Sequence, residues 1–196
     1  PVTIDWDANA AEKAGYEHFM LKEIYEQPKT INDTISPRIK DNDIVIEELN
    51  MSDEEIKEIT KIHIVACGSA YHTGVTAKYV IEGLARIPVE VDVASEFRYR
   101  DPILQKGNMV IVISQSGETA DTLAALRESR ERGFKVLGIV NVVGSSIARE
   151  ADSVMYTWAG PEIAVATTKA YSAQLTALYM LAMKFARVRG TIDQEK

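Results

Sequence analysis

The chain has 196 residues but only one cysteine, Cys67, so no disulfide can form within it. Such sparing use of cysteine is typical of reducing compartments, and we expect a cytoplasmic protein. Apolar runs are short, and none approaches the roughly 18 residues that a membrane-spanning helix needs. Lys and Arg number 22 against 29 Asp and Glu and form no cluster, so neither nucleic acid nor an anionic membrane is an expected partner.

Several familiar binding motifs are also missing from the chain. It contains neither G-x-x-x-x-G-K-[ST] nor G-x-G-x-x-G, so the common modes of nucleotide binding are not supported. The three histidines have no spacing to each other or to Cys67 that is typical of a metal site, and we expect no metal and no cofactor. We interpret His63 as a core or edge residue of a strand, and Cys67 as a small buried residue rather than a reactive thiol.

The first third of the chain predicts linker and helices. It does not begin with Met, and we expect it to be a piece of a longer protein, with residues 1–15 as linker. Apolar residues then recur at helical spacing, with an interruption at Pro28, and they are Phe19, Met20, Ile24, Tyr25 and Ile31. Ser52, followed three residues later by Glu55, predicts a capping box. We therefore assign residues 1–52 to linker and lead-in helices and residues 53–192 to one binding domain.

Strand and helix patterns alternate along residues 53–192. Strands are predicted at 61–68, 88–94, 109–114, 134–141 and 152–158, and helices at 70–87, 119–132, 144–151 and 167–190, with Gly133 ending the second. Continuously apolar strands indicate a parallel sheet covered on both faces, so we predict an α/β fold with a doubly wound, five-stranded sheet in flavodoxin-like order. The last helix is apolar around most of its surface, which predicts a covering surface from a missing domain or from a second subunit of a homodimer.

Three predicted turns share one chemistry where strands end. Residues 67–70, 114–119 and 165–169 are small and hydroxylated, and each precedes a helix. The amides at a helix N-terminus carry partial positive charge, and hydroxyl donors beside them can surround a phosphate without any arginine. Ordinary helix capping is the alternative, and it is favoured for Thr167 and Thr168. One cap needs one hydroxyl, whereas residues 114–119 supply three, so we predict a phosphate or sugar-phosphate site there.

Two charged residues in these turns have two readings each. Glu118 is either a general base or a carboxylate that complements the dipole of the helix that follows it. Lys169 either faces a phosphate or points to solvent, and solvent is the default position for a lysine.

Four stretches resemble a known family, namely CGSAYHTG, ISQSGETADTL, NVVGSSIAREAD and AGPEIAVATTKAY, and HFMLKEIYEQP and VASEFRYR fit as well. They resemble the sugar isomerase (SIS) family and, more narrowly, the isomerase domain of the glutamine–fructose-6-phosphate aminotransferases. That family makes glucosamine 6-phosphate from fructose 6-phosphate and glutamine, using a glutaminase domain followed by two SIS subdomains. The resemblance implies that this chain is the first SIS subdomain with its lead-in helix, and that the glutaminase and second SIS domains are its missing partners.

The resemblance also implies site residues. The phosphate would be held by Ser114, Gln115, Ser116 and Thr119, while the sugar side would be lined by Gly68, Ser69, Val165 and Thr167. Ala70 stands where the family usually has a serine, so we leave it out of the site. The family's acid–base residues lie in the second SIS subdomain, so we nominate no catalytic residue and expect binding of fructose 6-phosphate, glucose 6-phosphate or glucosamine 6-phosphate without turnover. The alternatives are a non-catalytic phosphosugar-sensing SIS module and, with a looser match at residues 69–76, a flavodoxin-like flavin binder.

Overall fold

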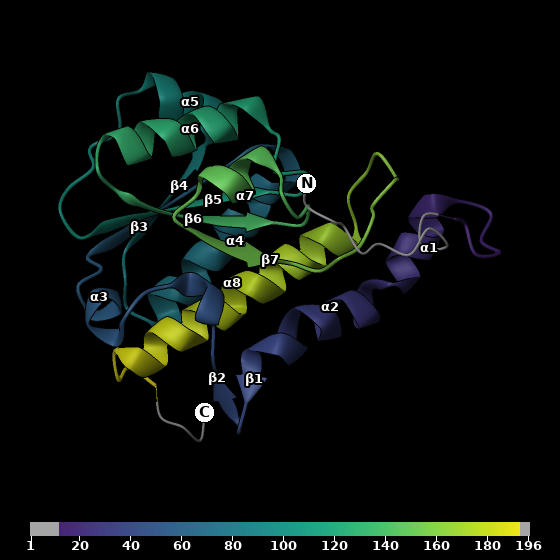
Figure 1. Cartoon of the computed structure of the whole chain (residues 1–196), viewed down its shortest axis with the longest axis horizontal. Coiled ribbons are helices and arrows are strands. Elements are labelled where there is room, and N and C mark those ends of the chain that lie inside the picture. Colours follow the sequence, from purple (N-terminus) through teal and green to yellow (C-terminus); the bar gives the residue numbers. More distant parts are fainter. Residues whose placement is uncertain (1–11, 193–196) are drawn as a thin grey trace.

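The computed structural model describes residues 12–192, and at its centre lies a parallel sheet of five strands. In spatial order these are β4 (Val89–Val93), β3 (Lys61–Ala66), β5 (Asn108–Ser114), β6 (Lys135–Val140) and β7 (Ser153–Tyr156). This order places the second strand of the sheet outside the first and the remaining three on the other side (Figure 1). The predicted doubly wound α/β fold is therefore confirmed.

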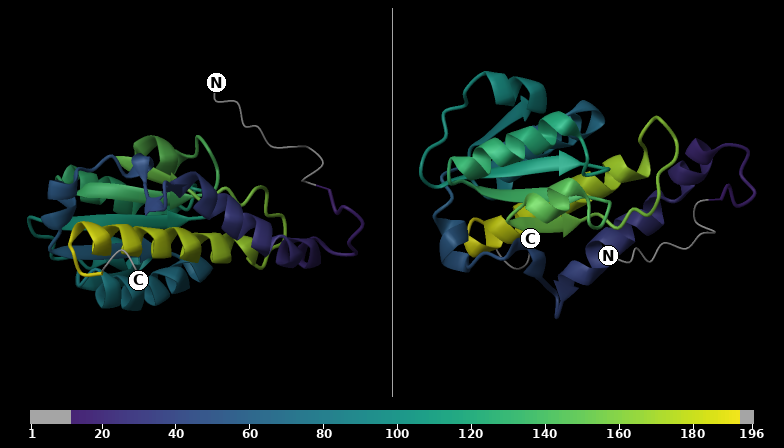
Figure 2. Two further views of the ribbon diagram at one scale, coloured as in Figure 1. Left: turned by 90° about the horizontal axis from the view of Figure 1, so that it is seen from below. Right: turned by 45° about the horizontal axis from the view of Figure 1, so that its top comes forward.

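Helices cover both faces of the sheet. On one face lie α5 (Ala94–Tyr99), α6 (Ala120–Glu131) and α7 (Ser146–Glu150), and on the other lie α4 (Gly68–Leu84) and α8 (Lys169–Val188) (Figures 1 and 2). Successive side chains of β5 point to opposite faces, so Ile111 and Ile113 join the core under α4 and α8, while Val110 and Val112 join the core under α6. This double burial explains why the strands are apolar without interruption.

The lead-in segment runs along α8. It comprises α1 (Phe19–Tyr25), α2 (Gln27–Ile35), the 3₁₀ turn η2 (Ser36–Arg38), the short strands β1 (Ile39–Lys40) and β2 (Asp43–Ile44), the 3₁₀ turn η3 (Glu47–Leu49) and α3 (Asp53–Lys57). The predicted linker lies mostly in residues 1–11, outside the described part of the chain. The predicted capping box at Ser52 is confirmed at the start of α3.

The lead-in covers the apolar surface of α8. Helix α2 packs beside α8, as α4 does on its other side (Figure 1). Arg38 is fully buried at the end of this segment, and its guanidinium donates to the backbone oxygens of Thr34 and Tyr156 and to the carboxylate of Glu48. The chain's own α2 therefore supplies part of the cover expected for α8. Cover from a missing domain or from a second subunit stays a prediction.

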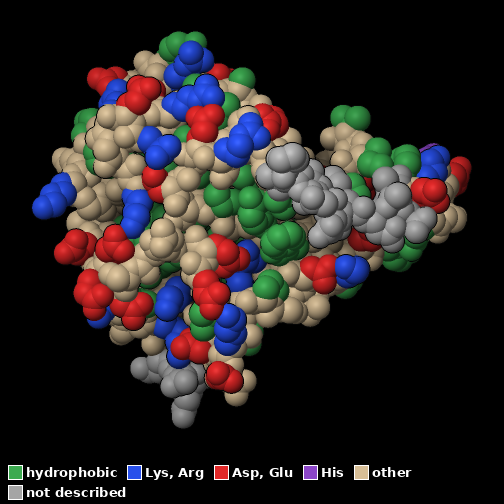
Figure 3. All heavy atoms as spheres, in the orientation of Figure 1, with side chains coloured by type: hydrophobic (Ala, Val, Ile, Leu, Met, Phe, Trp, Pro, Cys, Tyr) green, Lys and Arg blue, Asp and Glu red, His purple; other side chains and the backbone are tan. Residues whose placement is uncertain are grey.

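The helical pattern at residues 19–31 is interrupted as predicted, because α1 ends at Tyr25 and a second helix, α2, begins at Gln27. Pro28 lies in the first turn of α2, where its missing N–H has no intrahelical partner to lose. In α1 the apolar residues Met20, Ile24 and Tyr25 are 43%, 40% and 66% exposed, while the charged Lys22 and Glu23 are buried. Apolar side chains accordingly gather on the projecting end of the molecule (Figure 3). Within residues 12–192, no helix combines the length and apolar character that crossing a membrane requires.

Candidate functional site

The three hydroxylated turns meet at the carboxyl edge of the sheet. They enclose a cavity of 270 Å³, lined by Cys67, Ser69, Ala70, Ile113, Ser114, Gln115, Ser116, Thr119, Glu162, Ala164, Val165, Thr167 and Gln174. The cavity thus unites every predicted site residue except Gly68, which begins α4 immediately before Ser69. Ala70, which was not expected in the site, lines the wall, and Cys67 lies there half-buried rather than in the core. The fold brings these residues together because parallel strands end at one edge.

Hydroxyl groups shape the turn at 114–119. The buried Ser114 Oγ accepts from the amide of Gly117 at 3.0 Å and lies 2.9 Å from Thr119 Oγ1. Ser116 Oγ accepts from the amide of Glu118 at 3.2 Å. A serine hydroxyl that accepts one bond still has its own proton to donate, so Ser116 can donate into the cavity. The turn is therefore held in shape by the side chains that also line the cavity.

Gly117 gives this turn its close fit against the neighbouring loop. Its φ is +69°, in the left-handed region that L side chains rarely adopt, and an added Cβ would collide with the side chain of Ser145. Thr119 is the N-cap residue of α6, yet its side chain makes no capping bond. The first-turn amides of α6 have no intrahelical acceptor, so they are available to a ligand at this turn.

The third turn has a carboxylate that the sequence did not reveal. Glu162 Oε1 accepts from the amides of Thr168 at 2.9 Å and Ala170 at 3.2 Å, and its Oε2 accepts from Thr167 Oγ1 at 2.8 Å. The favoured interpretation of Thr167 and Thr168 as caps of α8 was wrong, because Glu162 caps that helix. The only signal in the sequence is an acid a few residues before a helix begins. Gln174, one turn into α8, was missed as well.

Lys169 faces neither a ligand nor solvent, contrary to both of its readings. It is 3% exposed and its Nζ lies 2.7 Å from Glu26 Oε2, on the lead-in segment. Among the residues that line the cavity there is consequently no lysine, arginine or histidine. Any anion bound there would rest on amides, hydroxyls and the dipole of α6.

Glu118 complements a different helix from the one expected. Its Oε1 accepts from the amide of Ser146 at 2.7 Å, at the start of α7. Hydrogen bonding to Ser146 lowers the pKa of this exposed carboxyl. A lowered pKa makes a carboxylate a weaker base, and Glu118 does not line the cavity, so the general-base reading has no support from the geometry.

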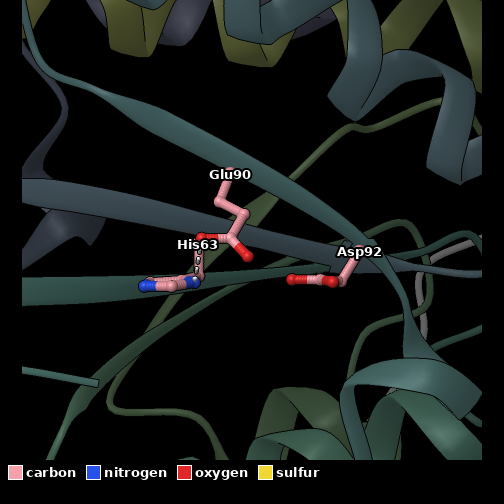
Figure 4. Close-up of side chains that lie close together, drawn as sticks. All are labelled: His63, Glu90 and Asp92. Atoms are coloured by element: carbon pink, nitrogen blue, oxygen red, sulfur yellow. Dashed lines mark ion pairs between the residues drawn. The ribbon is translucent and has the colours of Figure 1, made fainter. Parts of the chain in front are cut away.

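A second cluster of ionisable groups lies at the paired strands β3 and β4. His63 pairs in register with Glu90, and Asp92 lies two residues further on (Figure 4). One potential ligand atom from each of the three side chains lies within 4.8 Å of the others, a grouping that could hold a metal ion. His63 is buried as expected, and burial, with the charge of Lys61, lowers its pKa.

The carboxylates of this cluster already have cationic partners. Arg100 binds Asp92 through two hydrogen bonds, of 2.9 and 2.7 Å, and Lys61 binds Glu90. The bond from Lys61 lowers the pKa of Glu90, and the bond to Asp92 raises that of Arg100. A metal would have to displace these cations, so we assign the cluster as an ion-pair network away from the cavity.

The sheet order and a cavity at the carboxyl ends of its strands define a doubly wound α/β domain. The profile of the SIS domain matches residues 55–184, so the chain belongs to the SIS domain family. It is 61% identical over 194 residues to the glutamine–fructose-6-phosphate aminotransferase (isomerizing) of Clostridium tetani and 62% identical to that of Caldanaerobacter subterraneus. In both comparisons 98% of this chain aligns with 32% of the relative, so the chain spans about a third of their length. The predicted family resemblance is confirmed.

Two solved structures share the fold of this chain. The C-terminal domain of the glucosamine-fructose-6-phosphate aminotransferase from Francisella tularensis superposes with a TM-score of 0.89 at 43% identity, covering 94% of this chain and 52% of that one. A phosphosugar isomerase structure from Silicibacter pomeroyi, described as putative, shares the fold with a TM-score of 0.73 at 24% identity, covering 88% of this chain and 52% of that one.

Proposed function

We propose that this chain is the first SIS subdomain of a glutamine–fructose-6-phosphate aminotransferase and that its cavity binds a hexose 6-phosphate. The phosphate would lie at the 114–119 turn, and the sugar would extend toward residues 69 and 165–167. One observation carries this proposal: the N-terminus of α6 has no side-chain cap and lies at the cavity, where Ser116 and Thr119 form part of the wall. It is supported by the similarity of the chain to aminotransferases over nearly its whole length.

The residues of the cavity would bind the ligand but not carry out its chemistry. Amides at the head of α6 and the hydroxyls of Ser116 and Thr119 donate to a phosphate dianion, and Gln115 adds an amide group. Isomerisation and amino transfer need a general base within hydrogen-bond reach of the migrating proton. Glu162 is the one carboxylate on the wall, and its oxygens are engaged by α8 and Thr167. We therefore propose that turnover requires the second SIS and glutaminase domains of the longer protein, acting as a homodimer.

Calorimetric titration with fructose 6-phosphate and glucose 6-phosphate tests the proposal, with unphosphorylated fructose as the ligand control. Losing a hydrogen bond to a charged group costs about 1.5–3 kcal/mol, so Ser116→Ala and Thr119→Ala should each weaken binding about tenfold or more. Ser36→Ala, at an exposed serine that does not line the cavity, is the matched control and should bind as the wild type does. Unchanged affinity in both cavity variants would refute the site, and conversion of fructose 6-phosphate by this chain alone would refute the absence of turnover.

The two alternative functions are less well supported. No aromatic side chain lines the cavity, so it offers no ring to stack on an isoalloxazine, and a yellow purified protein would reverse that judgement. A phosphosugar-sensing module would share the binding site but would not be expected to share 61% identity with an enzyme, including its lead-in segment.

A further inference from the structure

Two helix heads of opposite electrostatic character border the same cavity. The head of α6 has no side-chain cap, and the lining residues that precede it, Ser114, Gln115, Ser116 and Thr119, are uncharged. The head of α8 is capped by the half-buried carboxylate of Glu162. An N-terminal helix dipole amounts to roughly half a positive charge, so a full negative charge more than cancels it. One end of the cavity thus attracts an anion while the other repels it.

Glu162 also sets the hydrogen-bonding direction of Thr167. An ionised carboxylate only accepts, so the 2.8 Å contact requires Thr167 Oγ1 to donate its proton to Glu162 Oε2. The lone pairs of Thr167 then remain for the cavity. Thr167 can accept from a sugar hydroxyl but cannot donate to a phosphate oxygen.

We propose that Glu162 is a positioning residue that sets the direction in which the sugar phosphate lies, with its phosphate at the 114–119 turn and its hydroxyl groups at Thr167. The carboxylate repels a second anionic group at the 162–168 end, so the cavity selects monophosphates over bisphosphates. This inference rests on the proposed function, since it concerns the orientation of the same ligand. It predicts that the two similar hydroxylated turns on one cavity do not compete for one phosphate.

Comparison of fructose 6-phosphate with fructose 1,6-bisphosphate tests this role by calorimetric titration. We expect the wild type to bind the bisphosphate at least about tenfold more weakly, because like charges placed together cost several kcal/mol. Glu162→Gln should reduce the ratio of the two Kd values, bisphosphate over monophosphate, to about threefold or less. Glu162→Asp, which keeps the charge, should retain the wild-type ratio. Gln has nearly the shape of Glu, so an exclusion based on size would persist in this variant, whereas one based on charge would be lifted.

Glu55→Gln is the matched control, because Glu55 is also a carboxylate at a helix N-terminus but lies at α3, outside the cavity. It should leave the ratio of the two Kd values unchanged, which separates a local effect from a change in net charge.

Salt provides a second measurement, which uses the wild type alone and so does not depend on how well the variants fold. Raising the salt concentration from 0.05 to 0.5 M should screen the charge of Glu162. The ratio of the wild-type Kd for the bisphosphate to that for fructose 6-phosphate should therefore decrease.

The outcomes separate this inference from the proposed function. A wild type that does not bind fructose 6-phosphate refutes the function itself. Binding that is weakened by Ser116→Ala, with a ratio that neither Glu162→Gln nor salt changes, refutes only the role of Glu162. A wild type that binds both ligands equally well also overturns it.

Discussion

Lys169 Nζ lies 2.7 Å from Glu26 Oε2, and this ion pair joins the lead-in segment to the first turn of α8. The two residues are 143 positions apart in the chain. The Lys169 side chain is 4% exposed and that of Glu26 is 28% exposed, so the ammonium depends on this partner for much of its compensation. A lysine that could have faced a ligand instead ties the lead-in segment to α8, the helix that follows the third turn of the cavity.

Removing the acid of this pair should destabilise the fold. We expect Glu26→Gln to lower the free energy of unfolding by about 2 kcal/mol, since a buried ammonium loses a charged hydrogen-bond partner. Denaturant unfolding followed by circular dichroism measures the effect. Glu17→Gln, an exposed acid of the same segment, should change stability by less than about 0.5 kcal/mol. Equal stabilities of the two variants would show that the pair is not a tether.

Gly117→Ala should damage both stability and ligand binding. The left-handed conformation costs an L residue about 1–2 kcal/mol, and here the new Cβ would also collide with Ser145. We expect a total loss above about 3 kcal/mol and at least tenfold weaker binding of fructose 6-phosphate. Gly133→Ala is matched, because Gly133 has φ +82° but its Cβ would meet open space. That variant should lose only about 1–2 kcal/mol in denaturant unfolding and bind normally. A milder effect at Gly117 than at Gly133 would contradict the role of the collision.

Stability should fall as the pH drops below about 6.5, because of His63. Burial and the charge of Lys61 lower the pKa of His63, although Asn108, Glu90 and Asp92 oppose the shift. The unfolded chain therefore binds a proton near the ordinary value of 6.5, while the folded chain resists it, so stability is lost from there down to the folded pKa. The slope for one proton cannot exceed about 1.4 kcal/mol per pH unit.

His63→Gln should flatten this part of the stability profile. The measurement is denaturant unfolding at several pH values between 5 and 7. Carboxyls with lowered pKa values, such as Glu90, lose their contribution only below their ordinary value of 4.5, so they act outside this window. A profile with the same slope in the variant and the wild type would show that His63 does not control it.

Cys67 should report on occupancy of the cavity. It is the single cysteine of the chain, it is half-buried, and it lines the cavity beside Ser69. Bound fructose 6-phosphate should slow its reaction with a thiol reagent such as DTNB about tenfold at a ligand concentration of about ten times Kd, because only unoccupied protein reacts. Unphosphorylated fructose should give no protection. Undiminished protection in Ser116→Ala at the same ligand concentration would show that Ser116 does not hold the ligand, since a tenfold weaker variant should be protected only about twofold.

The sheet and the position of the cavity were predictable because their signals are local. Continuous apolar strands followed by glycine and hydroxyl residues indicate where each strand ends, and parallel strands end at the same edge. The amino-acid pattern was therefore enough to place Ser69, Ser116 and Thr167 together. The pattern was not enough to predict that Glu162 caps α8. A carboxylate that precedes a helix can cap it only when the intervening loop brings the carboxylate to the helix amides.

Helix α1 is a second case in which the sequence pattern did not predict the structure. Its apolar spacing indicated a buried face, but the structure buries Glu23, whose carboxylate accepts from the amides of Ile163 and Ala164 at 2.6 and 3.2 Å. Two amides from a distant loop determine which side of the helix faces inward. Spacing within the helix contains no information about them.

The sequence by itself determined the strand and helix pattern, the edge of the sheet where the cavity lies and the family to which the chain belongs. These depend on backbone preferences and side-chain periodicities that act over a few neighbouring residues. Only the tertiary structure decided that α2 covers α8, that Lys169 pairs with Glu26, and that Glu162 gives one end of the cavity a negative charge. Charges and hydrogen bonds act through space, so their partners are known only once distant segments have been brought into contact.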